Sequence, residues 1–285
     1  MVKNPPWGMA APRFCRGSRL AGALLCWLFG GAAMAAATDP FPQLADAYLV
    51  QIGERVLWSR HADKRLPPAS LTKVMTALLV LEDYKPAHSV TISKSAAQAT
   101  GSRIRLKAGD QLSVEALLAA TLIASANDAC AALAEFNAGS VEAFVRKMNE
   151  RALALGLANT HFSNPCGFDG PGHYSSANDL IRITRAALAH PEFAELVARP
   201  GAEISTTDGK RRFQFRNKNA LIGTYAPAIG VKTGYTAKAG TCLIALAQKQ
   251  DARVLLVMLN AKRRWWDAIG IIENAFDEAV VHAAQ

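Results

Sequence analysis

The sequence predicts a mixed α/β (α+β) fold, with one antiparallel sheet built from both ends of the chain and a helical lobe inserted between them. Three observations predict it. Residues 47–59 alternate as a hairpin around Gly53, the middle of the chain carries apolar side chains three and four apart, and strand-like segments return after Pro200. The cleft between the sheet and the helical lobe is therefore the expected place for a functional site.

Each element can be placed from its pattern. Pro67 and Pro68 end the first hairpin, and the apolar run 71–81 that follows has helical spacing and no breaker. Turn-forming residues at 164–172 predict a loop between helices. The remaining helices are expected at 113–122, 128–136, 141–155, 177–188 and 265–284. The remaining strands are expected at 202–206 and 211–215, joined by Asp208-Gly209, and at 230–233, 241–246 and 254–259.

The first 37 residues have the pattern of a cleaved signal peptide. Four cations precede an apolar stretch at 20–33, and the small residues 35–37 follow as a cleavage site. A retained membrane anchor is the alternative, which Gly30 and Gly31 disfavour because they interrupt the apolar stretch. We therefore expect residues 38–285 to form a single domain that is exported to the periplasm or cell envelope, without an obvious membrane anchor after cleavage.

Charge and cysteine content narrow the class of protein. The formal net charge is +9, and removal of the four cations in the signal peptide leaves +5, without a basic stripe that would indicate nucleic acid as a partner. Outside the signal peptide the cysteines are Cys130, Cys166 and Cys242, which permit at most one disulfide. We expect all three to be small buried side chains. No spacing of Cys and His residues suits zinc, so neither a metal nor another cofactor is expected.

Three motifs follow one another along the chain, S-x-x-K at 70–73, S-x-N at 125–127 and K-T-G at 232–234. On a helix, Ser70 and Lys73 share one face with their Cβ atoms about 5–6 Å apart, so the lysine amine can reach the serine hydroxyl. Apolar neighbours of Lys73, together with the charge of Lys232, favour an uncharged amine that can act as a base. The helix N-terminus also directs the Ser70 N–H at a reacting carbonyl oxygen.

The other two motifs can supply the remaining parts of an acyl-transfer site. The Ser125 hydroxyl can pass a proton to a leaving amine, and the Asn127 carboxamide can bind a substrate backbone. Lys232 and Thr233 suit a terminal carboxylate, and Gly234 lets a peptide pair with the strand edge. The Tyr235 N–H is placed to complete an oxyanion hole. Each motif alone also fits an ordinary helix start, a cap or a turn, so the prediction depends on all three occurring in this order.

Extended segments around these motifs resemble the D-alanyl-D-alanine carboxypeptidases, the low-molecular-mass serine penicillin-binding proteins, in their single-domain form. The resemblance covers about Ala45 to Ala279, and its segments are 68–76, 125–130 and 232–240. It implies a β-lactamase and penicillin-binding-protein-like fold, an acyl-enzyme on Ser70, Lys73 as base, Ser125 as proton shuttle, and Lys232 holding a terminal carboxylate. The implied substrate is the D-Ala-D-Ala end of peptidoglycan stem peptides, with β-lactams as inhibitors.

Three other functions remain open from the sequence. Residues 101–106 and 215–217 also resemble single-domain D,D-endopeptidases that cut peptidoglycan crosslinks, and we expect no β-rich C-terminal domain after the last helix. A β-lactamase would need a glutamate to activate water, and the loop 164–174 contains Asp169 but no glutamate. A penicillin sensor would need a transmembrane signalling domain, which the sequence does not supply.

Overall fold

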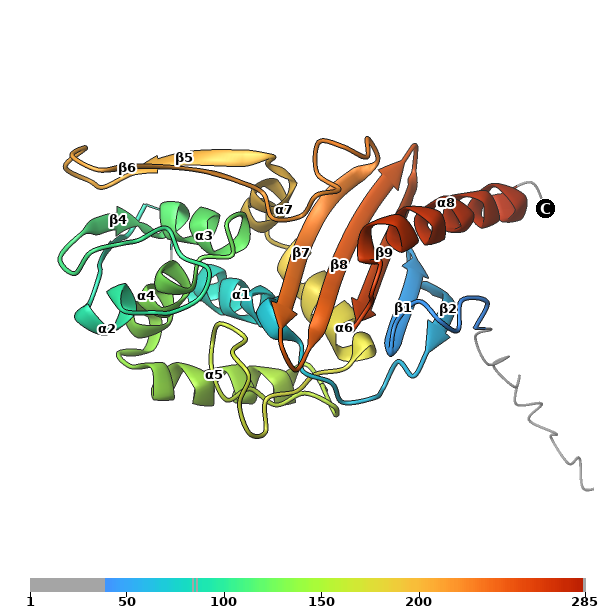
Figure 1. The fold of residues 1–285 in the computed structure, drawn as a ribbon, viewed down its shortest axis with the longest axis horizontal. Coiled ribbons are helices and arrows are strands. Elements are labelled where there is room, and N and C mark those ends of the chain that lie inside the picture. Colours follow the sequence, from blue (N-terminus) through green and yellow to red (C-terminus); the bar gives the residue numbers. More distant parts are fainter. Residues whose placement is uncertain (1–38, 84, 86, 284–285) are drawn as a thin grey trace, which may run out of the picture. The chain divides into compact units, whose positions relative to one another are not determined.

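A five-stranded antiparallel sheet contains the first two strands and the last three strands of the chain (Figure 1). The computed structural model describes residues 39–83, 85 and 87–283, so the expected signal peptide lies outside the described residues. The sheet strands, in spatial order, are β2 (Arg55–Arg60), β1 (Ala47–Ile52), β9 (Ala252–Leu259), β8 (Gly240–Lys249) and β7 (Ala228–Thr236). This order confirms the prediction of one sheet assembled from both ends of the chain.

The helical lobe occupies the sequence between β2 and β7, together with two small hairpins. The helices are the 3₁₀ turn η1 (Ala69–Thr72), α1 (Lys73–Asp83), α2 (Lys94–Ala97), α3 (Val114–Leu122), α4 (Asn127–Ala138), α5 (Val141–Ala154), α6 (Ala177–Leu188) and α7 (Pro191–Ala198), and α8 (Arg264–Ala283) follows the sheet. The hairpins pair β3 (Ser89–Thr91) with β4 (Gln111–Ser113), and β5 (Gly201–Ser205) with β6 (Arg212–Arg216).

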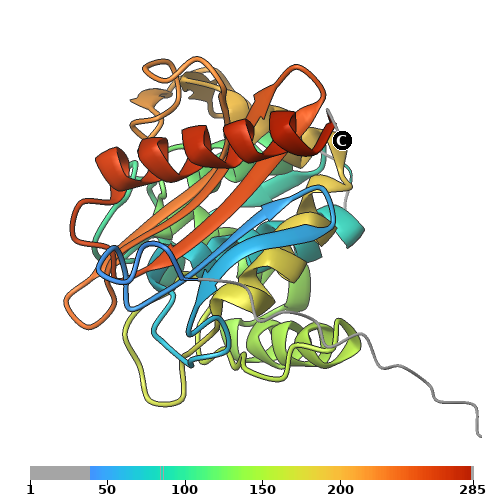
Figure 2. The same ribbon diagram turned by 90° about the vertical axis from the view of Figure 1, so that its right-hand side faces the viewer.

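Both faces of the sheet are covered, which explains why its central strands are almost wholly apolar. In β9, the side chains of Leu255, Val257 and Leu259 join the core that the sheet shares with the helical lobe. The alternate residues Leu256 and Met258 join a second core beneath α8, which lies across the other face of the sheet (Figure 2). Because strand side chains alternate between faces, a single run of hydrophobic residues can serve two cores.

Two glycines allow the segments around Ser70 to approach closely. A Cβ on Gly234 of β7 would stand 3.0 Å from the Pro68 carbonyl oxygen and 3.1 Å from the Ser70 nitrogen. Gly167 has a φ of +85°, and a Cβ there would overlap the Ala69 carbonyl. The sheet edge and the 164–174 loop are thereby held against the turn that carries Ser70.

The structure contains three features that were not predicted from the sequence, namely α2, the β3–β4 hairpin and α7. Helix α7 was not predicted, although Pro191 at its first turn and the spacing of Phe193, Leu196 and Val197 are helical signals. All three cysteines are buried as expected, and Cys130 and Cys166 form the one disulfide that their number permits, whereas Cys242 is free. In the described part of the chain, no helix is both long and apolar enough to cross a membrane.

Candidate active site

Ser70 and Lys73 lie where the 3₁₀ turn η1 passes directly into α1. A 3₁₀ helix has three residues per turn, so residues three apart lie on the same side, as expected for a helix. The Lys73 Nζ atom is 3.0 Å from Ser70 Oγ. Lys73 is completely buried, whereas Ser70 remains partly exposed. The Ser70 hydroxyl can therefore contact a bound ligand, whereas the Lys73 amine lies behind it.

Every hydrogen-bond partner of the Lys73 amine is an uncharged oxygen. Besides Ser70 Oγ, these are Asn127 Oδ1 at 2.8 Å and the Cys166 carbonyl oxygen at 2.5 Å. Burial lowers the pKa of Lys73 well below its ordinary value, and the positive charge of Lys232 lowers it further. A neutral amine has two N–H groups and one lone pair. The carbonyl oxygens of Asn127 and Cys166 only accept, so they take both N–H groups and leave the lone pair for the Ser70 hydroxyl.

Lys232 is also buried, and it contacts the second serine of the motifs. Its Nζ atom donates to Ser125 Oγ at 2.9 Å and to the Thr233 carbonyl oxygen at 3.0 Å. Burial lowers the pKa of Lys232 to about 7, with smaller contributions from the charges of Arg264 and Lys218. Ser125 adopts a positive φ of 59°, a conformation that non-glycine residues seldom adopt and that is often found at functional sites. Each of the two lysines is thus hydrogen-bonded to the hydroxyl of one serine.

Asn127 connects this site by hydrogen bonds to the segment 100–102. Its Nδ2 atom donates to the Thr100 carbonyl oxygen at 2.7 Å, and its backbone N–H donates to the Ser102 carbonyl oxygen at 2.7 Å. Its side-chain oxygen already accepts from Lys73. One N–H of the carboxamide is left over from these contacts for a ligand, because an amide nitrogen carries two.

The remaining predicted residues lie along β7, which is the edge strand of the sheet. Thr233 is buried beside Lys232, and the Tyr235 side chain is exposed. Gly234 packs so closely against the turn that carries Ser70 that a side chain would crowd it. This contact accounts for the glycine, whereas we expected its role to be pairing of the strand edge with a peptide. The free edge of β7 still presents backbone groups beside Ser70, as an extended ligand would require.

Two features of the site were not identified from the sequence. The guanidinium of Arg264, in the first turn of α8, donates to the carbonyl oxygens of Gly234 at 2.9 Å and Cys242 at 3.3 Å. His173 accepts from the Ser163 N–H through Nδ1, so its Nε2–H donates to the Thr72 hydroxyl at 2.9 Å. Burial lowers the pKa of His173 to about 4, which keeps this ring neutral. Neither residue belongs to a motif, and each reaches the site from far along the chain.

Together these residues bring a hydroxyl, a neutral amine and a second hydroxyl–cation pair to one edge of a sheet. This arrangement is suited to acyl transfer through a serine nucleophile, because the amine can remove the proton from the hydroxyl that attacks. The fold and the site therefore define the class of active-serine acyl-transfer proteins. Comparisons with known proteins identify the family within that class.

A family model described as D-alanyl-D-alanine carboxypeptidase matches residues 43–263. The chain belongs to this family. The D-alanyl-D-alanine carboxypeptidase DacF of Bacillus subtilis is 38% identical over 236 residues, which are 80% of this chain and 60% of that protein. DacC of Escherichia coli is 40% identical over 220 residues, 73% of this chain and 54% of that protein. The chain thus spans little more than half the length of these relatives.

A relative named for a different activity and a solved structure are also similar to this chain. A D-alanyl-D-alanine endopeptidase of Pseudomonas aeruginosa is 35% identical over 211 residues, 73% of this chain and 67% of that protein. The crystal structure of the Streptomyces K15 DD-transpeptidase has a TM-score of 0.78 and 31% identity, and the match covers 84% of this chain and 99% of that one. The mixed helix and antiparallel-sheet fold is therefore that of the penicillin-binding proteins, as predicted.

Proposed function

We propose that this protein is a serine-type D-Ala-D-Ala carboxypeptidase that removes the terminal D-alanine from peptidoglycan stem peptides. The observation that carries the proposal is the buried Lys73 amine, whose two carbonyl partners leave its lone pair 3.0 Å from the Ser70 hydroxyl. The family supports the substrate class, since several relatives carry the name D-alanyl-D-alanine carboxypeptidase.

In the proposed acylation step, Lys73 removes the proton of the Ser70 hydroxyl as its oxygen attacks the carbonyl carbon of the scissile peptide. The backbone N–H groups of Ser70 and Tyr235 stabilise the oxyanion that forms. When the carbon–nitrogen bond breaks, Ser125, which accepts a hydrogen bond from Lys232, donates a proton to the leaving amine, and the proton that Lys73 took from Ser70 replaces it. The products are an ester on Ser70 and free D-alanine.

In the proposed deacylation step, water attacks the ester and Lys73 accepts a proton from it. The bond between the Ser70 oxygen and the acyl carbon breaks, and the proton returns to Ser70 as the shortened peptide leaves. β-Lactams would enter the same reaction as mimics of the substrate, and their opened ring would remain attached as a long-lived ester on Ser70.

The terminal carboxylate of the substrate would bind to Lys232 and Thr233. No carboxylate in the described residues forms an ion pair with Lys73, Lys232 or Arg264. The site thus combines several basic side chains with no fixed anion, and a bound carboxylate would supply a counter-charge for Lys232 and Arg264.

We also propose that residues 1–37 are a signal peptide and that residues 38–285 act as one catalytic domain in the periplasm or cell envelope. A substrate in the cell wall supports this location. N-terminal sequencing of the protein recovered from its host would test it, since cleavage after Ala37 predicts Thr38 as the first residue.

Incubation with diacetyl-Lys-D-Ala-D-Ala tests the proposed activity. We expect sustained release of D-alanine, and we expect a fluorescent penicillin to label the wild-type protein but not the Ser70→Ala variant. Labelling of Ser70→Ala would refute the assignment of the nucleophile. Slow release of penicillin without peptide turnover would favour a sensor, and rapid hydrolysis of penicillin would favour a β-lactamase.

A D,D-endopeptidase is the second candidate, because the Pseudomonas relative carries that name and a groove beside Ala124, the residue before Ser125, is lined by five cations: Arg103, Arg105, Arg212, Arg216 and Lys218. The chemistry at Ser70 would be the same for both activities. They differ in the size and charge of the leaving group.

A further inference from the structure

A disulfide adjoins the lysine that is proposed as the base. Cys130 and Cys166 form it, and both side chains are buried. Cys130 belongs to α4, and Cys166 belongs to the loop 164–174. The carbonyl oxygen of Cys166 accepts a hydrogen bond from Lys73 Nζ at 2.5 Å. A residue that forms the crosslink is therefore also a residue that contacts the proposed base.

The two carbonyl acceptors of the Lys73 amine come from the two segments that this disulfide joins. Asn127, the first residue of α4, supplies its side-chain oxygen at 2.8 Å, and Cys130 follows three residues later in the same helix. The loop supplies the carbonyl oxygen of Cys166. The Cys166 Sγ atom also lies 3.8 Å from the backbone carbonyl oxygen of Asn127. The crosslink thus fixes the position of one acceptor relative to the other.

Helix α1 holds the same loop from its other side. Thr76, three residues after Lys73, donates through its hydroxyl to the Pro165 carbonyl oxygen at 2.6 Å. In α1 and in α4 alike, a residue of the site is followed three positions later by a residue that holds the loop, and side chains three apart share one face of a helix. The loop therefore bridges the two helices beside the Lys73 amine, through a hydrogen bond to α1 and a covalent bond to α4.

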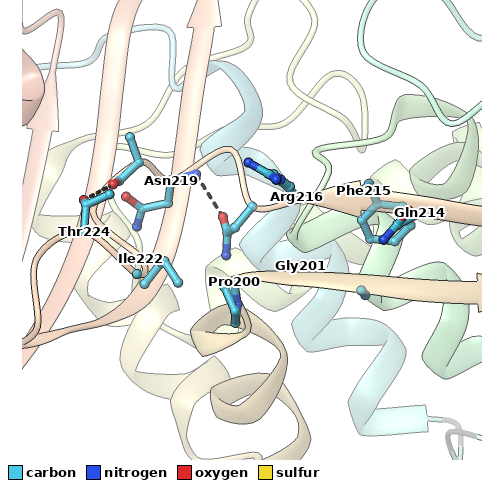
Figure 3. A pocket seen from close by; sticks show the side chains of 12 residues that line it. Pro200, Gly201, Gln214, Phe215, Arg216, Asn219, Ile222 and Thr224 are labelled. Atoms are coloured by element: carbon cyan, nitrogen blue, oxygen red, sulfur yellow. Dashed lines mark hydrogen bonds between the residues drawn. The ribbon is translucent and has the colours of Figure 1, made fainter.

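The shape of the loop does not depend on the disulfide, because local hydrogen bonds already define it. Asn164 Oδ1 accepts from the backbone N–H groups of residues 166–168. Figure 3 shows a comparable turn after β6, where the Asn219 N–H donates to the side chain of Asn217 at 2.9 Å. Bonds of this kind close a turn within a few residues but do not attach it to another element. The disulfide supplies that attachment to α4.

The lone pair of Lys73 points at Ser70 only while both carbonyl acceptors hold the two N–H groups of the amine. Hydrogen bonds weaken steeply as their distance and angle depart from the optimum, and a misplacement of about 1 Å can slow a catalysed step about a hundred-fold. Without the crosslink, the loop is free to move away from α4, and water can reach the amine. Burial is the main cause of the low pKa of Lys73, so contact with water would raise it.

We propose that the Cys130–Cys166 disulfide positions the carbonyl oxygen of Cys166 against Lys73, and that acylation of Ser70 needs this crosslink for its full rate. The two cysteines are positioning residues, since they act on the reaction through Lys73. The inference rests on the proposed role of Lys73 as the base. The crosslink also suits the proposed location in the periplasm or cell envelope, because disulfides persist in oxidising compartments.

The ionisable groups near Lys73 lie outside the crosslink. Lys232 of β7 lowers the pKa of Lys73 through its charge. On α4, the buried carboxylate of Asp128 accepts from three backbone N–H groups. On the loop, Asp169 accepts from the end of β7, and burial lowers the pKa of His173 to about 4. Loss of the crosslink removes none of these charges, so a shifted pH profile of acylation reports on the surroundings of Lys73.

Serine variants test the proposal through the rate of acylation by a fluorescent penicillin, measured by stopped flow over the pH range in which each protein stays folded. Cys130→Ser, Cys166→Ser and the double variant should each be acylated about ten-fold more slowly than the wild type at neutral pH. The acid limb of their pH profiles should move to higher pH by about half a unit or more, since less of the amine is then neutral at a given pH. Either substitution removes the whole crosslink, so the double variant should lose no more than a single one.

Reduction of the wild type removes the crosslink without changing any residue. Dithiothreitol supplies two electrons and two protons to the disulfide, leaves two thiols on the protein and is itself oxidised to a cyclic disulfide. Because the disulfide is buried, the reaction is carried out in urea and the protein is refolded with the reductant present, with mass spectrometry to confirm the two added hydrogen atoms. The reduced protein should show the same slow acylation and shifted profile as the serine variants, and reoxidation should restore the original rate.

Leu256→Ala is the matched control, because it destabilises the second core beneath α8 and leaves the crosslink intact. Its acylation rate and pH profile should be those of the wild type. Three results would overturn the proposal: an unchanged rate and profile in the serine variants or the reduced protein, equal losses in Leu256→Ala, or a loss in only one of the single serine variants. In each of them, penicillin labelling of the wild type would leave the proposed peptidase chemistry standing, whereas a wild type that is not labelled would refute the proposed function itself.

Discussion

The buried Lys232 predicts that the free energy of unfolding rises with pH above neutrality. Burial, with the charges of Arg264 and Lys218, lowers the pKa of Lys232 from 10.5 to about 7 in the folded protein. Between these two values the unfolded chain carries a proton that the folded chain lacks. Unfolding therefore takes up a proton, and raising the pH opposes it. The sign is the reverse of that for a lysine stabilised by a carboxylate.

The magnitude follows from the size of the pKa difference. One pKa unit corresponds to about 1.4 kcal/mol, so the protonation of Lys232 on unfolding should add about 2 kcal/mol of stability between pH 7 and pH 9. The Lys232→Met variant should lack this gain. Burial lowers the pKa of Lys73 in both proteins and gives a pH dependence of the same sign in each, while loss of the Lys232 charge raises the pKa of Lys73 somewhat in the variant. The comparison of stabilities stops at pH 9 because of Cys242. Burial raises the pKa of this thiol to about 11 in the folded protein, so above pH 9 its ionisation in the unfolded chain favours unfolding.

Urea unfolding followed by circular dichroism at pH 7, 8 and 9 would measure this effect. The wild type should gain about 2 kcal/mol more than Lys232→Met over the interval. The exposed Lys107→Met variant is the matched control and should follow the wild type. Equal slopes for the wild type and Lys232→Met would refute the argument, because Lys232 would then hold the same proton in the folded and unfolded states.

Three further predictions concern the site and its disulfide. Lys73→Arg should slow acylation by penicillin by about a hundred-fold or more, because a guanidinium stays protonated; a rate near that of the wild type, measured by stopped flow, would reduce the lysine to an electrostatic role. Lys232→Gln should lower kcat/KM for a D-Ala-D-Ala peptide by about ten- to hundred-fold and should affect the amidated peptide much less, since a charge-assisted hydrogen bond is worth about 1.5–3 kcal/mol; equal losses would place carboxylate recognition elsewhere. Replacement of Cys130 and Cys166 by Ser should lower the free energy of unfolding by about 4 kcal/mol, given their separation of 36 residues; Cys242→Ala is the control, and an equal loss there would contradict the assignment to the crosslink.

The local chemistry of the motifs could be predicted because it depends on neighbours in the sequence. Ser70 and Lys73 are three residues apart, and that spacing places their side chains together in either a 3₁₀ or an α-helical turn. The lowered pKa of Lys73 was also foreseeable from its apolar neighbours and from Lys232. The assembly of one sheet from both ends of the chain, though not the order of its strands, followed from strand patterns at those ends.

The partners that complete the site could not be predicted, because they come from distant segments. The Cys166 carbonyl that accepts from Lys73 lies 93 residues away, and no side-chain pattern marks a backbone oxygen. The contact of Ser125 with Lys232 spans 107 residues. Three cysteines allow three possible pairings and also allow none, so the Cys130–Cys166 disulfide could not be assigned from their number alone.

The two lysines have different roles because their partners differ. The contacts of Lys73 favour a neutral amine, whereas Lys232 is poised near neutrality and gains its proton when a carboxylate binds beside it. As seen from Lys73, the bound carboxylate offsets the proton that Lys232 gains, so the pKa of Lys73 stays low because of its burial. An amidated peptide carries no charge that would stabilise protonated Lys232. It therefore loses the charge-assisted hydrogen bond, and its deficit should appear in kcat/KM.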